Sequence, residues 1–410
     1  MESDTPSRAR INKWFRFSLQ ALAALSLGWV LNGCAAPREI SWAPNGKALA
    51  YCPDGRLRIY DVESKRSTPL YTNANASWPA WSPDGKAIAF YAISEGNAQR
   101  VAVRVIELAS GRVRTLIADV LRAPKLAHDA KRRTGSGESA TLGQDESRAA
   151  ILSISATIAW SPDATRLAYL AMAPVTKPIT TVLIADYPSG RTQAISNAAE
   201  AAIALAWSPD GQLLAYVSAP ASWLEGRNPG AGKQRTRHVP RQSLWLYDLQ
   251  SASRTKVCDL SKDGLAVGTR LVWSPDSNEI GFIAERGDSG ADAYIVEARR
   301  QGAVVDVMKG VTSEAVWSPA LTGVAFLEQR EDDEVVLLFR GVRPVTRKAI
   351  GSLRVTPLET FPDQPQQGQE PPAGVVGPYS LPEFSPDGRW VALRAGQSPK
   401  DMRLEMFQVR

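Results

Sequence analysis

The stretch Trp81-Ser82-Pro83-Asp84-Gly85-Lys86-Ala87-Ile88-Ala89-Phe90 is one of seven related phrases in this chain. The phrases begin at Trp42, Trp81, Trp160, Trp207, Trp273, Trp317 and, with Phe in place of Trp, at Phe384. Seven positions after each aromatic residue comes a triplet of the type large-small-large, such as Ile88-Ala89-Phe90. A fixed internal offset that recurs in seven copies indicates a structural repeat.

Each phrase predicts a tight turn between two strands. Pro83 presets φ for the first central turn position, Asp84 can accept hydrogen bonds from nearby backbone amides, and Gly85 accepts a positive φ. The triplet alternates large and small side chains across the two faces of the second strand, and both faces are apolar, which predicts burial on both. We interpret the carboxylates of the phrases as turn residues and not as a ring of ligands or catalytic acids. Asn45 and Ala320 fill the same slot in two copies.

The rest of each repeat follows one plan, which predicts the fold. An apolar strand that ends in an acid, such as Leu57 to Asp61, comes third, and a polar turn leads to a fourth strand, such as Val113 to Ile117. Four strands per repeat predict an all-β β-propeller with seven four-stranded blades. The chain ends after three strands of the seventh repeat, so we expect a three-stranded last blade. A six-bladed ring with one degenerate repeat is the alternative.

Uneven spacing between the phrases predicts three insertions within one propeller domain at 34–410. They fall at about 119–150, 218–241 and 351–378. The third is rich in Pro and Gln, which predicts irregular structure. Each insertion falls either between the second and third strands of a blade or between two blades, so we expect all three on the same face.

The phrases resemble the WD-repeat-like propeller repeats of TolB and related bacterial envelope proteins. The resemblance covers 39–410 and implies a propeller fold. TolB itself has an α/β domain before a six-bladed propeller, whereas this chain has seven phrases and no counterpart of that domain. The resemblance therefore implies a stand-alone propeller and does not by itself imply an activity.

The first 33 residues predict an export signal. Arg8, Arg10, Lys13 and Arg16 precede a mostly apolar run from Phe17 to Leu31, which is short for a membrane span. The run ends in Leu31-Asn32-Gly33-Cys34, which resembles the lipobox of bacterial lipoproteins. We therefore expect 1–33 to be a lipoprotein signal peptide and Cys34 to be the acylated first residue. The alternatives are an ordinary signal peptide and an uncleaved anchor. The lipobox implies a protein of the bacterial cell envelope that faces the periplasm or the exterior.

The sequence offers little material for catalysis. The chain has two histidines and three cysteines, and we find no nucleophile-base pair, phosphate-binding loop or metal-ligand spacing. We predict no catalytic residues, no metal site and no cofactor. Trp223 and Trp245 are interpreted as packing residues.

Two insertions concentrate positive charge. Residues 121–133 carry five basic side chains against Asp129, a net charge of +4, and 219–241 carry five against Glu225, again +4. The whole chain has a net charge of only +6. The predicted partner-binding residues are Arg122, Lys125, Lys131, Arg132, Arg133, Arg227, Lys233, Arg235, Arg237 and Arg241. One interpretation is that the two insertions are solvated loops without a partner. The alternative hypothesis is that they form a docking face for an anionic envelope component or envelope protein, and not for nucleic acid.

Two functions from different classes follow. The first is a membrane-tethered, non-enzymatic binding or scaffold module of the envelope. The second is a propeller hydrolase or lyase that acts on glycans or lactones. Acids that converge at one mouth of the central channel would favour the enzyme.

Overall fold

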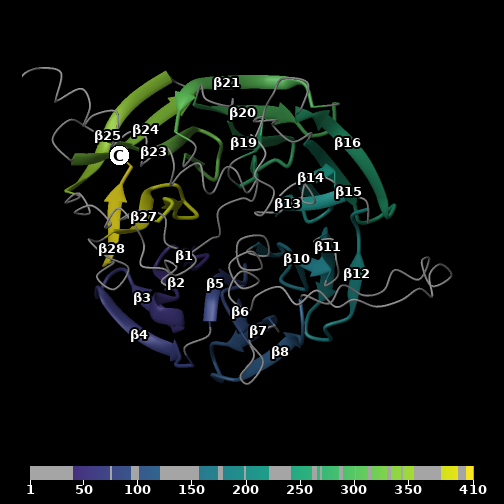
Figure 1. Cartoon of the computed structure of the whole chain (residues 1–410). Helices are drawn as coiled ribbons and strands as arrows, with labels where there is room; N and C mark the ends of the chain where they lie inside the picture. The colour runs from purple at the N-terminus through teal and green to yellow at the C-terminus, as the bar shows by residue number, and fades with distance from the viewer. Residues whose placement is uncertain are drawn as a thin grey trace, which may run out of the picture.

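The computed structural model arranges seven antiparallel sheets around one axis (Figure 1). It describes residues 40–73, 76–93, 101–120, 157–173, 179–197, 200–220, 242–260, 266–267, 270–285, 290–300, 302–312, 315–329, 334–342, 345–354, 380–395 and 403–409. We number the sheets as blades 1 to 7 in chain order. Seven sheets confirm the predicted seven-bladed propeller and exclude the six-bladed alternative. Among these residues, no helix has the length and apolar character needed to cross a membrane.

The strands of the first four blades match the predicted plan. Blade 1 contains β1 (Ile40–Trp42), β2 (Ala48–Tyr51), β3 (Leu57–Asp61) and β4 (Arg66–Tyr71), with a short 3-10 turn at Pro53–Gly55. Blade 2 contains β5 (Ala76–Trp81), β6 (Ala87–Ile93), β7 (Val101–Glu107) and β8 (Val113–Ile117). Blade 3 contains β9 (Ile158–Trp160), β10 (Arg166–Ala173), β11 (Ile179–Asp186) and β12 (Thr192–Ala194). Blade 4 contains β13 (Glu200–Trp207), β14 (Leu213–Pro220), β15 (Ser243–Asp248) and β16 (Ser253–Asp259).

The last three blades show two variations on that plan. In blade 5 the first strand has two parts, β17 (Ala266–Val267) and β18 (Val272–Trp273), which both pair with β19 (Glu279–Glu285), followed by β20 (Ala291–Glu297) and β21 (Val304–Val311). Blade 6 contains β22 (Val316–Trp317), β23 (Gly323–Gln329), β24 (Glu334–Val342) and β25 (Val345–Arg354). Blade 7 contains β26 (Glu383–Phe384), β27 (Trp390–Ala395) and β28 (Arg403–Gln408). Within the described chain, the last blade thus has the three strands expected for it.

Each phrase forms the predicted turn between the first and second strands of its blade. The residue at the fifth position has a positive φ in all seven copies. These residues are Gly46, Gly85, Ala164, Gly211, Ser277, Leu321 and Gly388. In five of the turns the phrase serine hydroxyl donates to the phrase aspartate, as Ser82 Oγ does to Asp84 Oδ1 at 2.6 Å. The turn therefore satisfies its polar groups internally, as strand ends next to a buried core require.

The triplet sets the distance between blades. Ile88 and Phe90 pack in the cluster shared with blade 1, whereas Ala89 packs in the cluster shared with blade 3. All three side chains are fully buried. The same division recurs around the ring, so the large residues face the preceding blade and the small residue faces the following one.

Five of the six phrase tryptophans donate a hydrogen bond to a neighbouring blade, and Trp81 is the exception. The indole Nε1 of Trp160 donates to the carbonyl of Ala80 in blade 2, at 3.0 Å, and Trp207 donates in the same way to Ala159. Trp273 donates to Ala206 in the same way, whereas Trp317 donates to Phe282 on the second strand of blade 5. A buried indole N–H is usually satisfied by such an acceptor, and each bond adds a polar contact between two blades.

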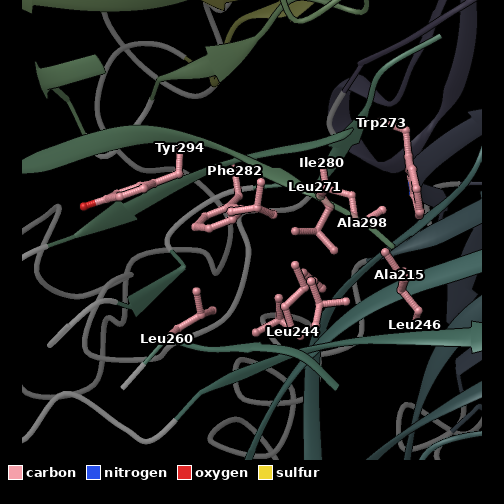
Figure 2. Close-up of a cluster of buried hydrophobic side chains, with 14 of the residues drawn as sticks. Ala215, Leu244, Leu246, Leu260, Leu271, Trp273, Ile280, Phe282, Tyr294 and Ala298 are labelled. Carbon is pink, nitrogen blue, oxygen red and sulfur yellow. The ribbon is translucent and has the colours of Figure 1, made fainter. Parts of the chain in front are cut away.

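Apolar clusters lie between the blades and not around the axis. Figure 2 shows the cluster between blades 4 and 5, which Leu244 and Leu246 enter from one side and Trp273 and Phe282 from the other. At the next interface, Gly281 takes the place of the usual alanine. An added Cβ there would lie 2.5 Å from Leu321 Cδ2 and 3.1 Å from the Trp317 ring. Blade 5 therefore omits a methyl group where blade 6 carries a large turn residue.

The ring closes between blades 7 and 1 through the same contacts as elsewhere. Trp42 Nε1 donates to the carbonyl of Glu383 at 3.1 Å. Leu49 and Ala392 pack in one buried cluster beneath this bond. Side-chain packing and an indole hydrogen bond thus join the two ends of the described chain.

The strand directions define two faces of the ring. The turns between first and second strands and between third and fourth strands lie on one face, which we call the turn face. The connections between second and third strands and between blades lie on the other, which we call the loop face. Consecutive strands are antiparallel in every blade, so this assignment holds all the way round.

Candidate functional site

The phrase carboxylates belong to the turns and form no reactive group. Partial burial by itself raises the carboxyl pKa of Asp84, Asp163 and Asp387, but bonds from serine hydroxyls and backbone amides outweigh it and lower the pKa overall. The pKa of Asp276 is lowered chiefly by the Ser274 hydroxyl and by Asn278. A general acid needs the opposite shift. These carboxylates therefore act as ionised turn residues.

The predicted partner-binding residues and Cys34 lie outside the described residues. So do most of the three insertions, although 119–120 are described, 218–220 belong to β14, and 351–354 belong to β25. Their points of attachment are nevertheless defined. The first insertion joins β8 of blade 2 to β9 of blade 3, and the second joins β14 to β15 within blade 4. Both connections are on the loop face, and only blade 3 lies between blades 2 and 4.

One charged pair lies in the central channel. Arg270 precedes β18 of blade 5, Glu383 begins β26 of blade 7, and their side chains form an ion pair. Blade 6 separates these blades in the ring, so the two side chains meet on the channel side of its innermost strand. Their side chains are only 17% and 10% exposed. The pair therefore joins two non-adjacent blades, and both of its side chains are largely buried.

The sequence analysis did not identify this pair, although a signal was available. The residue just before the phrase aromatic is small or apolar in six repeats and is glutamate only at 383. The six are Ser41, Ala80, Ala159, Ala206, Val272 and Val316. Glu383 stands out from an alignment of the phrases, but its partner does not, because Arg270 is remote in sequence and the contact depends on the closed ring.

A strained aromatic residue also lies on an innermost strand. Trp78 has a φ of +46°, within a bulge of β5 between Ser77 and Ala80. Its half-buried indole makes an edge contact with Tyr91, at 5.9 Å between ring centroids. A bulky residue in the left-handed region is uncommon, and bulges of this kind redirect a side chain.

Blade 4 carries a polar cluster on its face toward blade 3. Arg254 Nη1 donates to Glu200 Oε2 at 3.1 Å and to Tyr216 Oη at 3.0 Å. The guanidinium carbon of Arg254 lies 4.7 Å from the Trp245 ring centroid, and Lys256 Nζ lies 5.2 Å from it. Burial raises the pKa of Tyr216 to about 12, and Arg254 opposes that rise only in part. Trp245 thus packs beneath two cations, in line with its interpretation as a packing residue.

The described part of the chain contains no cluster of possible metal ligands. Within it, no three His, Cys, Asp or Glu side chains are grouped closely enough to hold a metal ion. The arrangement offers a rigid ring, a channel spanned by an ion pair, and a loop face that carries the insertions. Such a frame can present segments to a partner at fixed positions.

Comparison with known proteins supports the fold. The sequence matches no protein-family model and no curated protein. Among solved structures, an oligogalacturonate lyase in complex with manganese aligns with a TM-score of 0.59 and 13% identity, over 92% of this chain and 90% of that one. The β-propeller domain of the Trilobed protease from Pyrococcus furiosus aligns at 0.52 and 13%, over 92% and 96%.

TolB from Acinetobacter baumannii is also among the structural neighbours, with a TM-score of 0.42 and 16% identity, over 74% of this chain and 60% of that one. We infer nothing about this chain from that likeness. At these identities the two better alignments establish a propeller and nothing about activity.

The channel pair should stabilise the ring. Removing one member of a buried ion pair leaves a charge in a dry site, so Arg270→Met should lower the free energy of unfolding in urea by about 3–5 kcal/mol. The double variant Arg270→Met with Glu383→Gln should recover part of that loss. The exposed pair between Arg347 and Glu328, 2.7 Å apart, is the control. There Arg347→Met should change stability by less than about 1 kcal/mol. Additive effects of the two channel substitutions would contradict the assignment.

Proposed function

We propose that this chain is an exported, membrane-tethered propeller lipoprotein that serves as a non-enzymatic binding or scaffold module of the bacterial envelope. It docks an anionic envelope partner through its loop face. The observation that carries the proposal is that the strands flanking both basic segments open on one face, on either side of blade 3. Residues 121–133 of the first insertion carry a net charge of +4, as do residues 219–241 of the second. Two clusters of one sign on one face attract a partner of the opposite sign and accelerate its encounter.

The partner's chemistry follows from that charge. An acidic protein patch, a polyanionic glycan or anionic lipid headgroups would each complement the loop face. The turn face is different, because its arginines alternate with carboxylates. Asp387 and Arg389 lie 3.8 Å apart there, as do Glu297 and Arg300 at 3.9 Å. By contrast, residues 121–133 and 219–241 each carry five basic side chains against one acidic side chain.

The tether rests on the sequence that ends at Cys34. A single acyl chain binds membranes only marginally, whereas the several chains of a lipoprotein anchor it stably. A tether that begins close to β1 would hold the propeller near the bilayer. The short segment from 34 to 39 leaves little slack for the ring to move away from the surface.

Replacement of Cys34 tests the tether. Cys34→Ala should move the protein from the membrane fraction to the soluble fraction, because the variant cannot be acylated there. Cys52→Ala, in the described part of blade 1, is the control and should leave the distribution unchanged. A Cys34→Ala protein that is processed and stays in the membrane fraction as before would contradict the lipoprotein assignment.

Neutralising the basic insertions tests the docking face. The variant with Arg132, Arg133, Arg235 and Arg237 replaced by Ser should retain less of its crosslinked partner from native membranes, and rising salt should reduce retention by the unmodified protein. The matched control replaces four exposed arginines of the turn face, Arg112, Arg191, Arg300 and Arg389, and removes the same charge. Retention that depends neither on salt nor on which set is replaced would contradict the proposal.

A further inference from the structure

The interface between blades 7 and 1, which we call the closing interface, is less covered than the other six. Three positions allow all seven interfaces to be compared. Two belong to the following blade: the last residue of its triplet, and the third-strand residue that pairs with the first residue of the triplet. The last belongs to the preceding blade and is the third-strand residue that pairs with the small triplet residue. Directly paired residues of antiparallel strands share a face, so all three side chains point into the interface.

At the closing interface all three side chains are only half-buried, and they are Tyr51, Tyr60 and Met406. The three positions are all buried at the interfaces between blades 2 and 3, 3 and 4, and 4 and 5. These buried residues are Tyr169, Ala185, Val105, Tyr216, Tyr247, Ile184, Phe282, Val296 and Leu246. Each of the remaining three interfaces keeps at least one of the positions buried, through Phe90 and Ile106, Phe326 and Ile295, or Leu393.

The buried apolar cluster at the closing interface is small as well. Among the described residues its buried members are Ile40, Trp42, Leu49 and Ala392, and the side chains that surround them are half-buried. The clusters between blades 2 and 3 and between blades 4 and 5 have several times as many buried members. Burial of apolar surface is the main favourable term that holds packed elements together. The closing interface is therefore the least stabilised of the seven in the described part of the ring.

The backbone gives the closing interface no compensation within the described residues. At each of the other six interfaces the chain itself runs from one blade into the next. Here the described contacts are side-chain packing, at the place where β28 lies near β3 (Figure 1), and the bond from Trp42 to the carbonyl of Glu383. The kinds of contact are the same as elsewhere, but they cover less apolar surface.

The ion pair in the channel indicates on which side blade 7 stays when this interface separates. The side chain of Glu383 ties blade 7 to Arg270 of blade 5, across blade 6. The backbone carbonyl of the same residue accepts the bond from Trp42 of blade 1. Loss of the contact with blade 1 therefore leaves the largely buried ion pair intact.

We propose that the ring opens at the closing interface while its other six interfaces stay closed, and that blade 7 then moves together with blades 5 and 6. Proteins open locally where their stability is lowest. This opening exposes Trp42 and Leu49 and creates a route from the side of the ring to the central channel. It depends neither on the proposed tether nor on the proposed docking face.

The accessibility of engineered cysteines tests the proposal. The first triplet residue is a buried leucine in blades 1, 3 and 4, namely Leu49, Leu167 and Leu214. Replacing each of them by Cys in the full-length protein makes the same change at the same position of three interfaces. Labelling by N-ethylmaleimide in native buffer is followed at each engineered position by peptide mass spectrometry. Leu49→Cys should be labelled at least about tenfold faster than the other two variants.

The urea dependence of labelling separates local opening from a general loss of stability. Opening of one interface exposes less surface than unfolding of the whole ring. The labelling rate of Leu49→Cys should therefore rise less steeply with urea than global unfolding of the same variant does. Equal labelling rates in the three variants, or a urea dependence at Leu49→Cys that matches its global unfolding, would overturn the proposal.

Removing single indole bonds shows whether the interfaces open independently. Trp42→Phe removes the bond to blade 7 and should accelerate labelling of Leu49→Cys but not of Leu214→Cys. Trp207→Phe is the matched control, because it removes the equivalent bond between blades 3 and 4. It should leave labelling of Leu49→Cys unchanged. Acceleration of both cysteine variants by Trp42→Phe would contradict an opening confined to the closing interface.

The role of the ion pair is tested at the interface between blades 6 and 7. Val391 is the first triplet residue of blade 7 and is fully buried against blade 6. Arg270→Met should accelerate labelling of Val391→Cys, because blade 7 then loses its link to blade 5. An unchanged rate would show that the ion pair does not keep blade 7 with blades 5 and 6, and would overturn that part of the proposal.

Discussion

The fold depends on the fit between a phrase tryptophan and the small residue that the preceding blade presents to it. In every repeat the triplet turns its small member toward the next blade, and four successive interfaces, together with the closure between blades 7 and 1, add an indole N–H bond to the neighbouring backbone. A larger residue at that position would push the blades apart, because close-packed interiors have little free volume. The distance between neighbouring blades therefore depends on the small residue, alanine or glycine, that each blade presents to the next.

The repeating part of this arrangement could be predicted from sequence because it is local. Pro83, Asp84 and Gly85 are turn residues whatever surrounds them, and the alternation of Ile88, Ala89 and Phe90 indicates two buried faces. From seven such phrases the number of blades follows. The three strands in the described part of blade 7 agree with the prediction as well.

The non-repeating features could not be predicted, because they depend on which blades meet. In the sequence, Gly281 is only a glycine within a predicted strand, which is an unfavourable residue for a strand. The structure gives the reason, because Leu321 of the next blade fills the space that a methyl group at 281 would occupy. Arg270 and Glu383 form a pair only when the ring brings blades 5 and 7 to the same channel. The predicted basic docking residues remain a prediction, since they all lie outside the described residues; what the fold adds is the face to which their segments attach.

The most direct test of the interface rule is the stability of Gly281→Ala, measured by urea unfolding alone and in a Leu321→Gly background. Replacing a strand glycine by alanine ordinarily stabilises a protein by about 0.4–1 kcal/mol where the backbone allows it. Here the added methyl would lie 2.5 Å from Leu321 Cδ2, so the single substitution should instead destabilise the protein by about 1–3 kcal/mol. The double variant has alanine in the triplet of blade 5 and glycine in the turn of blade 6, which is the common combination in this ring. In the Leu321→Gly background the destabilisation by Gly281→Ala should therefore disappear. A Gly281→Ala protein that is more stable than the parent, or equally destabilised in both backgrounds, would contradict this account.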